Sequence, residues 1–310
     1  MIRLGLIGLG SWGQRYVDRV GRRSDCSIRA VVRSARVSAS TVAGAETIAD
    51  WQGLVQLAAA GGLDGIIAAT QPDHQADVAL ACAHEGVPLL VEKPLGLTSR
   101  AALAVLQAFE TSASKPPILV DYIHLWAPAF VALREHVREA SAESAIATIA
   151  SRGWSHGPFR SFSPVFDYGA HDLAMILTLI GLDAPINSTS HHRLAVEAAG
   201  GELHEFHFSL GPVSVRMQVG NGASTKARLL AVRLLDGREW VYDDQRAHPG
   251  KLEYDGRPIP VETIGPLDRV IEDFVRRLHA WRRTRLADAA TGADLALSVR
   301  INGILEQLST

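Results

Sequence analysis

The sequence predicts an α/β fold, with an N-terminal doubly wound parallel sheet and a C-terminal α+β domain that carries a largely antiparallel open sheet. Three observations predict it. The first 120 residues alternate short apolar runs with helical patterns, and strands that are apolar throughout indicate a parallel sheet covered on both sides. From about residue 186, strand-like runs follow one another across turns, as antiparallel strands do. The length of 310 residues favours two domains over one.

The expected strands of the first domain are rich in Ile, Val and Leu, and helix-like stretches separate them. The strands are expected at Ile2–Ile7, Ile28–Val32, Gly65–Ala69, Leu89–Val91 and Ile118–Tyr122, and the helices at Ser11–Arg22, Asp50–Ala59, Asp73–Glu85 and Ser99–Phe109. We therefore place the first domain at residues 1–120 and the second at residues 121–310.

The second domain mixes helices with a longer series of strands. The run HEFHFSLGPVSVRMQV alternates apolar and polar residues, which suits antiparallel strands with one covered face. The other expected segments are a helix at Pro128–Glu139, a strand at Ala145–Ser151, a loop at 153–166, a helix at about Tyr168–Ile180, a helix from Pro266, and a last helix at about Asp294–Leu308.

Composition and charge exclude several classes of partner. The formal net charge is -2, and no basic stripe interleaved with aromatic residues indicates a nucleic acid partner. No apolar run is long enough to span a bilayer, so no membrane partner is expected. The two cysteines, Cys26 and Cys82, make a disulfide scaffold unexpected, and the start MIRLGLIGLG lacks the features of a signal peptide. We therefore expect a cytoplasmic globular protein.

A glycine motif follows the first expected strand directly, with the sequence GLGSWG at residues 8–13. The first glycine permits a tight turn, the second allows the backbone to approach a pyrophosphate, and the third lets the helix pack on the strand. A helix N-terminus that follows such a turn favours phosphate. We predict a dinucleotide-binding turn of the Rossmann type, with Gly8, Gly10, Ser11, Trp12 and Gly13 at the cofactor; the alternative is an ordinary glycine turn.

The segment after the second strand bears on which dinucleotide is bound. An NAD-preferring site usually carries an acidic residue there, which holds the ribose 2′-hydroxyl. This chain has Arg33, Ser34 and Arg36 and no acid. Because an arginine can pair with a 2′-phosphate, NADP is favoured and NAD is the alternative. The alternative interpretation is that these arginines are solvated loop residues.

The sequence VEKP places charged residues at the end of a buried strand. In open α/β sheets, ligands bind beyond the carboxyl ends of the strands. Lys93 is therefore a candidate to hydrogen-bond a substrate oxygen and to stabilise developing negative charge, while Glu92 holds the lysine and Pro94 fixes the backbone direction. The alternative is a surface ion pair at the start of a loop.

A second candidate constellation is DYGAHD, in which Asp167 and His171 are four residues apart and share a helix face. His171 is a candidate proton acceptor, and a carboxylate one turn away would orient it. Alternatively, Asp167 is a helix N-cap and His171 a structural residue. No metal is predicted, because Asp167, His171 and Asp172 are not accompanied by a further ligand at a typical spacing.

Two further groups of polar residues stay open. His191 and His192, and His204 with His207, lie in strand-like segments; residues 204 and 207 point to opposite faces, so we interpret them as ordinary strand residues. The segment 153–160 offers Trp154, Ser155, His156 and Arg160, a mixture suited to sugar contacts, although it could be a plain surface loop.

With these motifs in view, the chain resembles the Gfo/Idh/MocA family of NAD(P)-dependent oxidoreductases over nearly its whole length. GLGSWG, ATQPDH, VEKP, DYGAHD and PLDRVIEDFVRRL are similar to family motifs. The resemblance implies further site residues, which are, for the cofactor, Thr70, Pro72, His74, Glu92 and Lys93, and for the substrate, Lys93, Tyr122, His124, Trp154, Arg160, Asp167 and His171.

The chain also departs from the family pattern at three places. The proline of TQPDH stands one residue late, Ala174 replaces a second acid, and His124 stands where many relatives have arginine. These departures leave the expected chemistry intact and put the usual substrates in doubt.

The family chemistry is reversible hydride transfer between nicotinamide and a carbinol or carbonyl carbon of a sugar, sugar nucleotide or polyol. The resemblance implies that His171 takes the hydroxyl proton and that Lys93 stabilises the oxyanion and helps to relay the proton. It implies that Asp167 either positions His171 or binds a neighbouring hydroxyl. It also implies a second domain for substrate binding and oligomerisation, last helices that return toward the first domain, and a homodimer or homotetramer. The rival functions are reduction of an imine or conjugated bond, and non-catalytic NADP binding by a regulatory protein.

Overall fold

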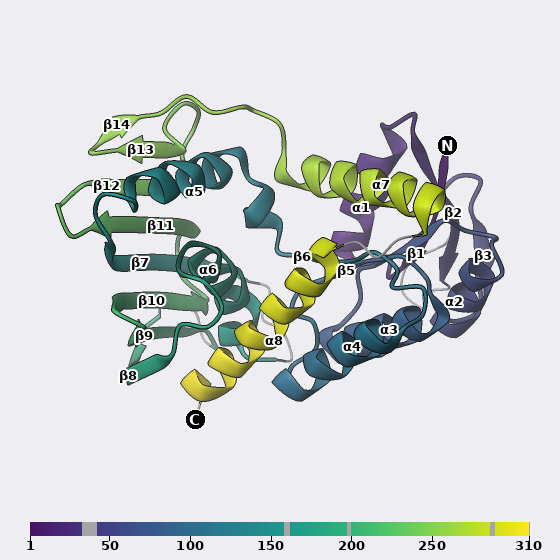
Figure 1. Ribbon diagram of the computed structural model, residues 1–310, viewed down its shortest axis with the longest axis horizontal. Coiled ribbons are helices and arrows are strands. Elements are labelled where there is room, and N and C mark those ends of the chain that lie inside the picture. The colour runs from purple at the N-terminus through teal and green to yellow at the C-terminus, as the bar shows by residue number, and fades with distance from the viewer. Residues whose placement is uncertain (33–41, 158–161, 197–199, 286–288, 310) are drawn as a thin grey trace. The chain divides into compact units, whose positions relative to one another are not determined.

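The computed structural model describes residues 1–310 except for 33–41, 158–161, 197–199, 286–288 and 310. The chain forms two units. Unit 1 contains Met1–Asp121 and Leu267–Val299, and unit 2 contains Tyr122–Pro266 and Arg300–Thr310. Each unit is built on a sheet of its own, and Figure 1 shows the helices that accompany each sheet.

Unit 1 contains a six-stranded parallel sheet with the order β3-β2-β1-β4-β5-β6. The chain runs outward from β1 to β3 and then crosses back to β4, which is the doubly wound topology that the apolar runs predicted. The strands are β1 (Ile2–Ile7), β2 (Cys26–Val32), β3 (Glu46–Ile48), β4 (Gly65–Ala68), β5 (Leu89–Glu92) and β6 (Ile118–Asp121). Strand β3 was not predicted, because its residues are exposed or half-buried and form no apolar run.

Helices cover both faces of this sheet, so that every residue of β4, β5 and β6 is buried. Helices α2, α3 and α4 lie on one face and α1 and α7 on the other (Figure 1). Gly65 in β4 permits α7 to approach closely, since a Cβ there would press on Phe274 and Leu278. The helices are α1 (Ser11–Gly21), α2 (Trp51–Ala59), α3 (Pro72–Glu85), α4 (Ser99–Thr111), α7 (Pro266–Thr284) and α8 (Ala289–Ser309).

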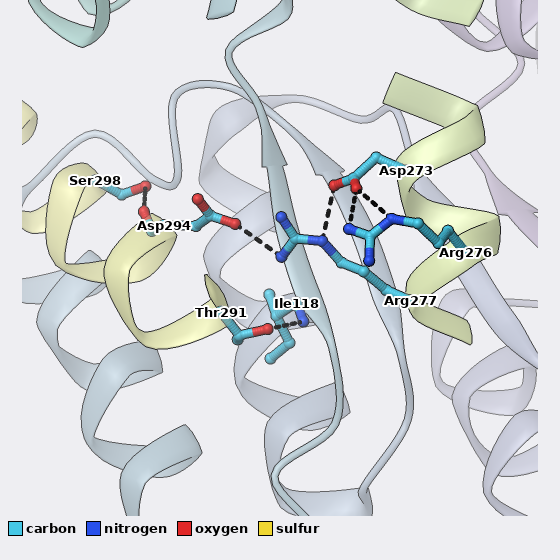
Figure 2. A network of polar contacts seen from close by, with 7 residues as sticks. All are labelled: Ile118, Asp273, Arg276, Arg277, Thr291, Asp294 and Ser298. Carbon is cyan, nitrogen blue, oxygen red and sulfur yellow. Dashed lines mark hydrogen bonds and ion pairs between the residues drawn. The ribbon is translucent and has the colours of Figure 1, made fainter. Parts of the chain in front are cut away.

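Polar contacts attach the late helices to unit 1 (Figure 2). The guanidinium of Arg277, which is 8% exposed, donates to Asp273 at 2.8 Å within α7 and to Asp294 of α8 at 3.0 Å. The fully buried hydroxyl of Thr291 accepts from the backbone N–H of Ile118 at 3.2 Å. The start of α8 is therefore joined both to α7 and to the first residue of β6.

Unit 2 contains an eight-stranded sheet with the order β14-β13-β12-β11-β7-β10-β9-β8. All neighbouring strands are antiparallel except β7 and β10, which confirms a largely antiparallel sheet. The strands are β7 (Ile146–Ser155), β8 (Ile186–Leu194), β9 (Glu202–Leu210), β10 (Val213–Asn221), β11 (Ala227–Leu234), β12 (Glu239–Asp243), β13 (Leu252–Tyr254) and β14 (Arg257–Pro258).

Two helices and a short 3-10 turn pack on one face of this sheet, namely η2 (Ile123–Trp126), α5 (Pro128–Ala140) and α6 (Pro164–Ile180). Along β10, Val215 and Met217 are buried under α6, whereas Ser214 and Arg216 on the other face are exposed. The alternation in the sequence therefore corresponds to one covered and one solvated face, as predicted. In the part of the chain that the structure describes, no helix is long and apolar enough to cross a membrane.

The structure corrects the loop expected at 153–166. Residues 153–155 continue β7, where Trp154 pairs with Gly220 of β10 and with Ala227 of β11. The Gly-Trp-Ser composition suggested a loop, but pairing on both sides holds the segment in the sheet. Helix α6 also begins earlier than expected, at Pro164.

Candidate functional site

The glycine turn after β1 has the geometry that a dinucleotide site needs. Gly8 has a positive φ of 95°, and a Cβ there would collide with the carbonyl oxygen of Ala69. A Cβ on Gly13 would collide with the carbonyl oxygen of Gly8, so the turn packs against α1 only without side chains. A Cβ on Gly10, in contrast, would meet no atom within 4 Å. Gly8 and Gly13 therefore shape the turn, and Gly10 leaves its surface open.

The first turn of α1 lies beside that open surface. Gly10 is the N-cap residue and provides no side-chain hydrogen bond to the first N–H groups of the helix. Such N–H groups and the positive end of the helix dipole favour an anionic ligand. Ser11 is exposed at this helix start, and Trp12 is half-buried with the guanidinium of Arg15 4.5 Å from its ring centroid. The segment thus fits the pyrophosphate of a dinucleotide.

The other predicted cofactor residues of unit 1 follow neighbouring strands. Thr70 and Pro72 follow β4, with Pro72 as the first residue of α3, and the carbonyl of Thr70 accepts from the Gln75 amide at 3.0 Å. His74 lies in the first turn of α3 and is exposed. Since β1, β4 and β5 are neighbours in a parallel sheet, the glycine turn, the Thr70 segment and Lys93 all lie at one edge, where ligands bind in such sheets.

The carboxyl ends of β5 and β6 hold a buried ionisable cluster. Glu92 is 6% exposed, Lys93 8% and Asp121 1%. The hydroxyl of Tyr16, a fully buried residue of α1, lies 3.1 Å from Glu92 Oε1 and 2.5 Å from Asp121 Oδ2. Burial, followed by the nearby Asp121, raises the pKa of Glu92 above its usual range, while the Lys93 charge opposes the shift. Because Lys93 is this deeply buried, VEKP is not an ordinary surface ion pair.

In unit 2, α6 carries Asp167 and His171 one turn apart, at 6% and 7% exposure. His124 of η2 meets His171 edge to face, with ring centroids 5.0 Å apart. Nδ1 of His124 shares a 2.9 Å hydrogen bond with the hydroxyl of Tyr242, a fully buried residue of β12. Burial raises the pKa of Tyr242 well above 10, so its hydroxyl stays protonated at neutral pH. The predicted base thus has a second imidazole beside it, and a tyrosine holds that imidazole.

Asp167 is not the N-cap of α6, contrary to one alternative. Helix α6 begins at Pro164, and the hydroxyl of Ser163 accepts from the Val165 N–H at 3.2 Å as the cap. Asp167 therefore lies inside the first turn, where it faces the same side as His171 one turn later.

Asp172 has a structural partner rather than a metal-binding one. Its carboxylate, which is fully buried, pairs with the guanidinium of Arg228 from β11. Burial raises the pKa of Asp172 to about 6, and the Arg228 charge opposes that shift. Among the described residues, no group of three or more His, Cys, Asp or Glu side chains is placed to hold a metal ion.

The other predicted residues are two aromatic side chains of unit 2 and several residues outside the described part of the chain. Tyr122 is buried, at 1% exposure, and Trp154 is half-buried on β7. Arg33 and Ser34, like Arg36 beside them, and Arg160 lie outside the described residues, so the two residues that favour NADP and one predicted substrate contact stay sequence-based predictions.

His191, His192, His204 and His207 lie in strands of unit 2. His204 contacts His191 on the neighbouring strand at 2.9 Å, and His207 pairs with Glu205 at 2.9 Å. His204 and His207 therefore have different partners on opposite faces of β9, consistent with their interpretation as strand residues.

Sequence reasoning missed Tyr16, Asp121, Tyr242 and Arg228. Asp121 could have been found, since it is a charged residue at the end of a buried strand, the same signal that drew attention to Glu92. Tyr16 and Tyr242 carry no such signal, because their partners are 76 and 118 residues away in the chain.

Comparison with known proteins agrees with this geometry. Residues 2–116 match the family described as "Oxidoreductase family, NAD-binding Rossmann fold", GFO_IDH_MocA. Inositol 2-dehydrogenase of Rhizobium meliloti (strain 1021) is 26% identical over 226 residues, which are 71% of this chain and 66% of that protein. Rhizopine catabolism protein MocA of Rhizobium meliloti is 28% identical over 185 residues, or 58% and 57% of the two chains. The alignments therefore span less than two thirds of the length of these curated relatives.

Solved structures cover almost the whole chain. A protein from Magnetospirillum magnetotacticum MS-1 has a TM-score of 0.79 and 26% identity, with 98% of each chain covered. The myo-inositol dehydrogenase of Lactobacillus casei, in complex with NAD(H) and myo-inositol, has a TM-score of 0.78 and 15% identity, with 100% of this chain and 94% of the other covered. That second likeness is one of fold. These findings show that residues 2–116 match an NAD-binding Rossmann domain of the oxidoreductase family GFO_IDH_MocA, and that the chain is similar to oxidoreductases of that kind over most of its length.

Proposed function

We propose that the chain is a dehydrogenase that oxidises a carbinol carbon of a polyol or sugar, and reduces the corresponding carbonyl, with NADP preferred over NAD. The observation that carries the proposal is a pair of imidazoles, the buried His171 and the half-buried His124 edge-on at 5.0 Å, with Asp167 on the same helix as His171. A protein that only binds a dinucleotide has no need of such a pair of imidazoles. The relatives named inositol 2-dehydrogenase support a polyol as the substrate class.

The proposed chemistry divides between the bound cofactor and this chain. NAD(P) would supply the hydride acceptor, and the residues of the glycine turn would hold its pyrophosphate. The imidazole of His171 accepts the proton of the substrate hydroxyl, and Asp167 orients the ring and stabilises its charged form. The ammonium of Lys93 stabilises the oxyanion as it forms. His124, fixed by Tyr242, donates a hydrogen bond to a neighbouring substrate hydroxyl.

The preference for NADP rests on Arg33 and Ser34 and on the absence of an acid after the second strand. A guanidinium pairs with a 2′-phosphate, whereas a carboxylate would repel it. Fluorescence titration of the purified protein with NADPH and with NADH tests this preference. We expect tighter binding of NADPH; tighter binding of NADH would remove the preference and leave the dehydrogenase.

The experiment that tests the function is a screen of inositols, other polyols and sugars with NADP and NAD, followed by substitution of the base. We expect His171→Ala to lower kcat by roughly 100-fold or more, the usual contribution of a general base, with little change in the Kd for NADPH. His279→Ala is the matched control, since His279 is exposed on α7. Equal kcat values in the two variants would remove His171 from the mechanism.

A further inference from the structure

One buried cluster has more ionisable groups than the proposed chemistry uses. The carboxyl groups of Glu92 and Asp121 lie opposite each other at the ends of paired strands β5 and β6. Both are buried, and one hydroxyl, that of Tyr16, lies within hydrogen-bonding distance of both. Tyr16 comes from α1, the helix that begins at the glycine turn. The cluster therefore joins the cofactor turn to the strand end that carries Lys93.

The number of hydrogens available for hydrogen bonding limits the protonation states that this cluster can adopt. A tyrosine hydroxyl has one hydrogen to donate and can accept at its oxygen. Two ionised carboxylates would both require that hydrogen, and together with the Lys93 ammonium they would leave a net negative charge in a buried site. Burying an uncompensated charge costs far more than protonating one acid. One carboxyl group therefore holds a proton near neutral pH.

The distances from the Tyr16 hydroxyl to the two carboxyl groups indicate which of them holds the proton. Tyr16 Oη lies 2.5 Å from Asp121 Oδ2, within the range of a hydroxyl that donates to a carboxylate. It lies 3.1 Å from Glu92 Oε1, a length that suits an uncharged partner better. Tyr16 thus donates to ionised Asp121, and a protonated Glu92 donates to the Tyr16 oxygen. Burial and the charge of Asp121 both raise the pKa of Glu92, in agreement with this direction.

The charges around the cluster then balance. Oδ1 of Asp121 is buried and accepts no hydrogen bond from the described residues. The Lys93 charge lowers the pKa of both carboxyls, and so does the hydrogen bond with Tyr16. The Lys93 ammonium therefore serves as the counter-ion of Asp121.

We propose that Glu92, Tyr16 and Asp121 are positioning residues whose two carboxyl groups hold one proton between them, with Glu92 as the neutral acid and Asp121 as the carboxylate that is the counter-ion of the Lys93 ammonium. The inference rests on the proposed function for the role of Lys93, but the protonation state of the cluster can be measured without any substrate.

Infrared spectroscopy tests the protonation state in the whole protein near neutral pH. A protonated carboxyl group absorbs at a higher frequency than a carboxylate, and ¹³C labelling of glutamate side chains shifts the band if Glu92 carries the proton. We expect one such band in the wild type, shifted by ¹³C-glutamate and not by ¹³C-aspartate, and lost in Glu92→Gln. The band should also be lost in Asp121→Asn, because Glu92 then ionises and becomes the counter-ion of Lys93. Asp172→Asn, which alters a buried carboxyl that pairs with Arg228, should keep it.

The pH profile of kcat/KM gives a second readout that a purely structural role would not change. Either single variant keeps one carboxylate beside Lys93, so its alkaline limb should stay within a few tenths of a pH unit of the wild type. Glu92→Gln/Asp121→Asn removes both charges, and its alkaline limb should move by at least about one unit to lower pH, a tenfold change at fixed pH. A far-ultraviolet circular dichroism spectrum like that of the wild type verifies that the double variant is folded.

Each of these results tests the inference independently of the proposed dehydrogenase function. Absence of an acid band in the wild type, or a band that shifts with ¹³C-aspartate, overturns the assignment of the proton, even if the chain is an active dehydrogenase. An unchanged alkaline limb in the double variant overturns the role toward Lys93. If no polyol or sugar is oxidised, the proposed function fails, and the infrared result still stands or falls by itself.

Discussion

The three glycines of the turn allow cofactor binding and stability to be separated by single substitutions. Gly10 has φ −69° and ψ −169°, an extended conformation that alanine adopts without strain, and a Cβ there meets no atom within 4 Å. Gly13 has no such room, because its Cβ would collide with the carbonyl oxygen of Gly8. Gly10→Ala should therefore fold normally and obstruct the cofactor, whereas Gly13→Ala should disturb the turn itself.

The magnitudes follow from these two environments. For Gly10→Ala, the loss of a favourable N-cap residue and the reduced freedom of the unfolded chain oppose each other, so the free energy of unfolding should change by less than about 1 kcal/mol. The methyl group occupies the surface where a phosphate oxygen would approach the helix N–H groups. Losing one hydrogen bond to a charged group costs about 1.5–3 kcal/mol, which weakens Kd roughly 10- to 150-fold. Gly13→Ala should cost about 1–3 kcal/mol of stability through overpacking.

Two measurements on the same preparations test the separate effects on cofactor binding and on stability. Fluorescence titration with NADPH and NADH gives the Kd, and denaturant unfolding gives the change in stability. Wild-type affinity in Gly10→Ala would refute the location of the pyrophosphate at α1. Destabilisation of Gly10→Ala as large as that of Gly13→Ala would refute the open surface beside Gly10.

Three more predictions concern the two units. Arg277→Met removes a nearly buried guanidinium from both Asp273 and Asp294 and should lower the free energy of unfolding by about 1.5–3 kcal/mol. Arg276→Met, whose side chain is 68% exposed, should change it by less than about 0.5 kcal/mol. Burial raises the pKa of Asp172 to about 6, so the folded state binds this proton more readily than the unfolded state. The free energy of unfolding of the wild type, relative to that of Asp172→Asn, should therefore increase as pH falls through 6. A decrease in this difference over the same pH range would contradict the assignment. Tyr242→Phe removes the hydroxyl that holds His124 and should lower kcat/KM for the polyol roughly fivefold, the value of one hydrogen bond, with an unchanged Kd for NADPH.

Local sequence patterns were sufficient for most of the fold. The strands β1, β4, β5 and β6 are short apolar runs because both faces of the sheet are covered, so each can be recognised without knowledge of its neighbours. Strand β3 could not be recognised, because it lies at the sheet edge with exposed residues. Residues 153–155 were misread for a related reason: their composition is typical of loops, and pairing with two strands overrides it.

The candidate site was predictable where chemistry and local pattern coincide. The glycine turn, Lys93 and the pair Asp167 and His171 all stand in short motifs. Their partners do not: Tyr16 reaches Asp121 across 105 residues of chain, and Tyr242 reaches His124 across 118. Such partners depend on the register of distant strands and on where a helix is laid over a sheet, which no local pattern records.

The proposed dehydrogenase is tested most directly by following deuterium from a polyol labelled at its carbinol carbon into the reduced nicotinamide. The wild type should transfer the label to the cofactor and release the corresponding ketone, and His171→Ala should lose the transfer while it still binds NADPH. Reduced cofactor without the label, or equal transfer by His171→Ala, would contradict hydride transfer from a carbinol carbon with His171 as the base.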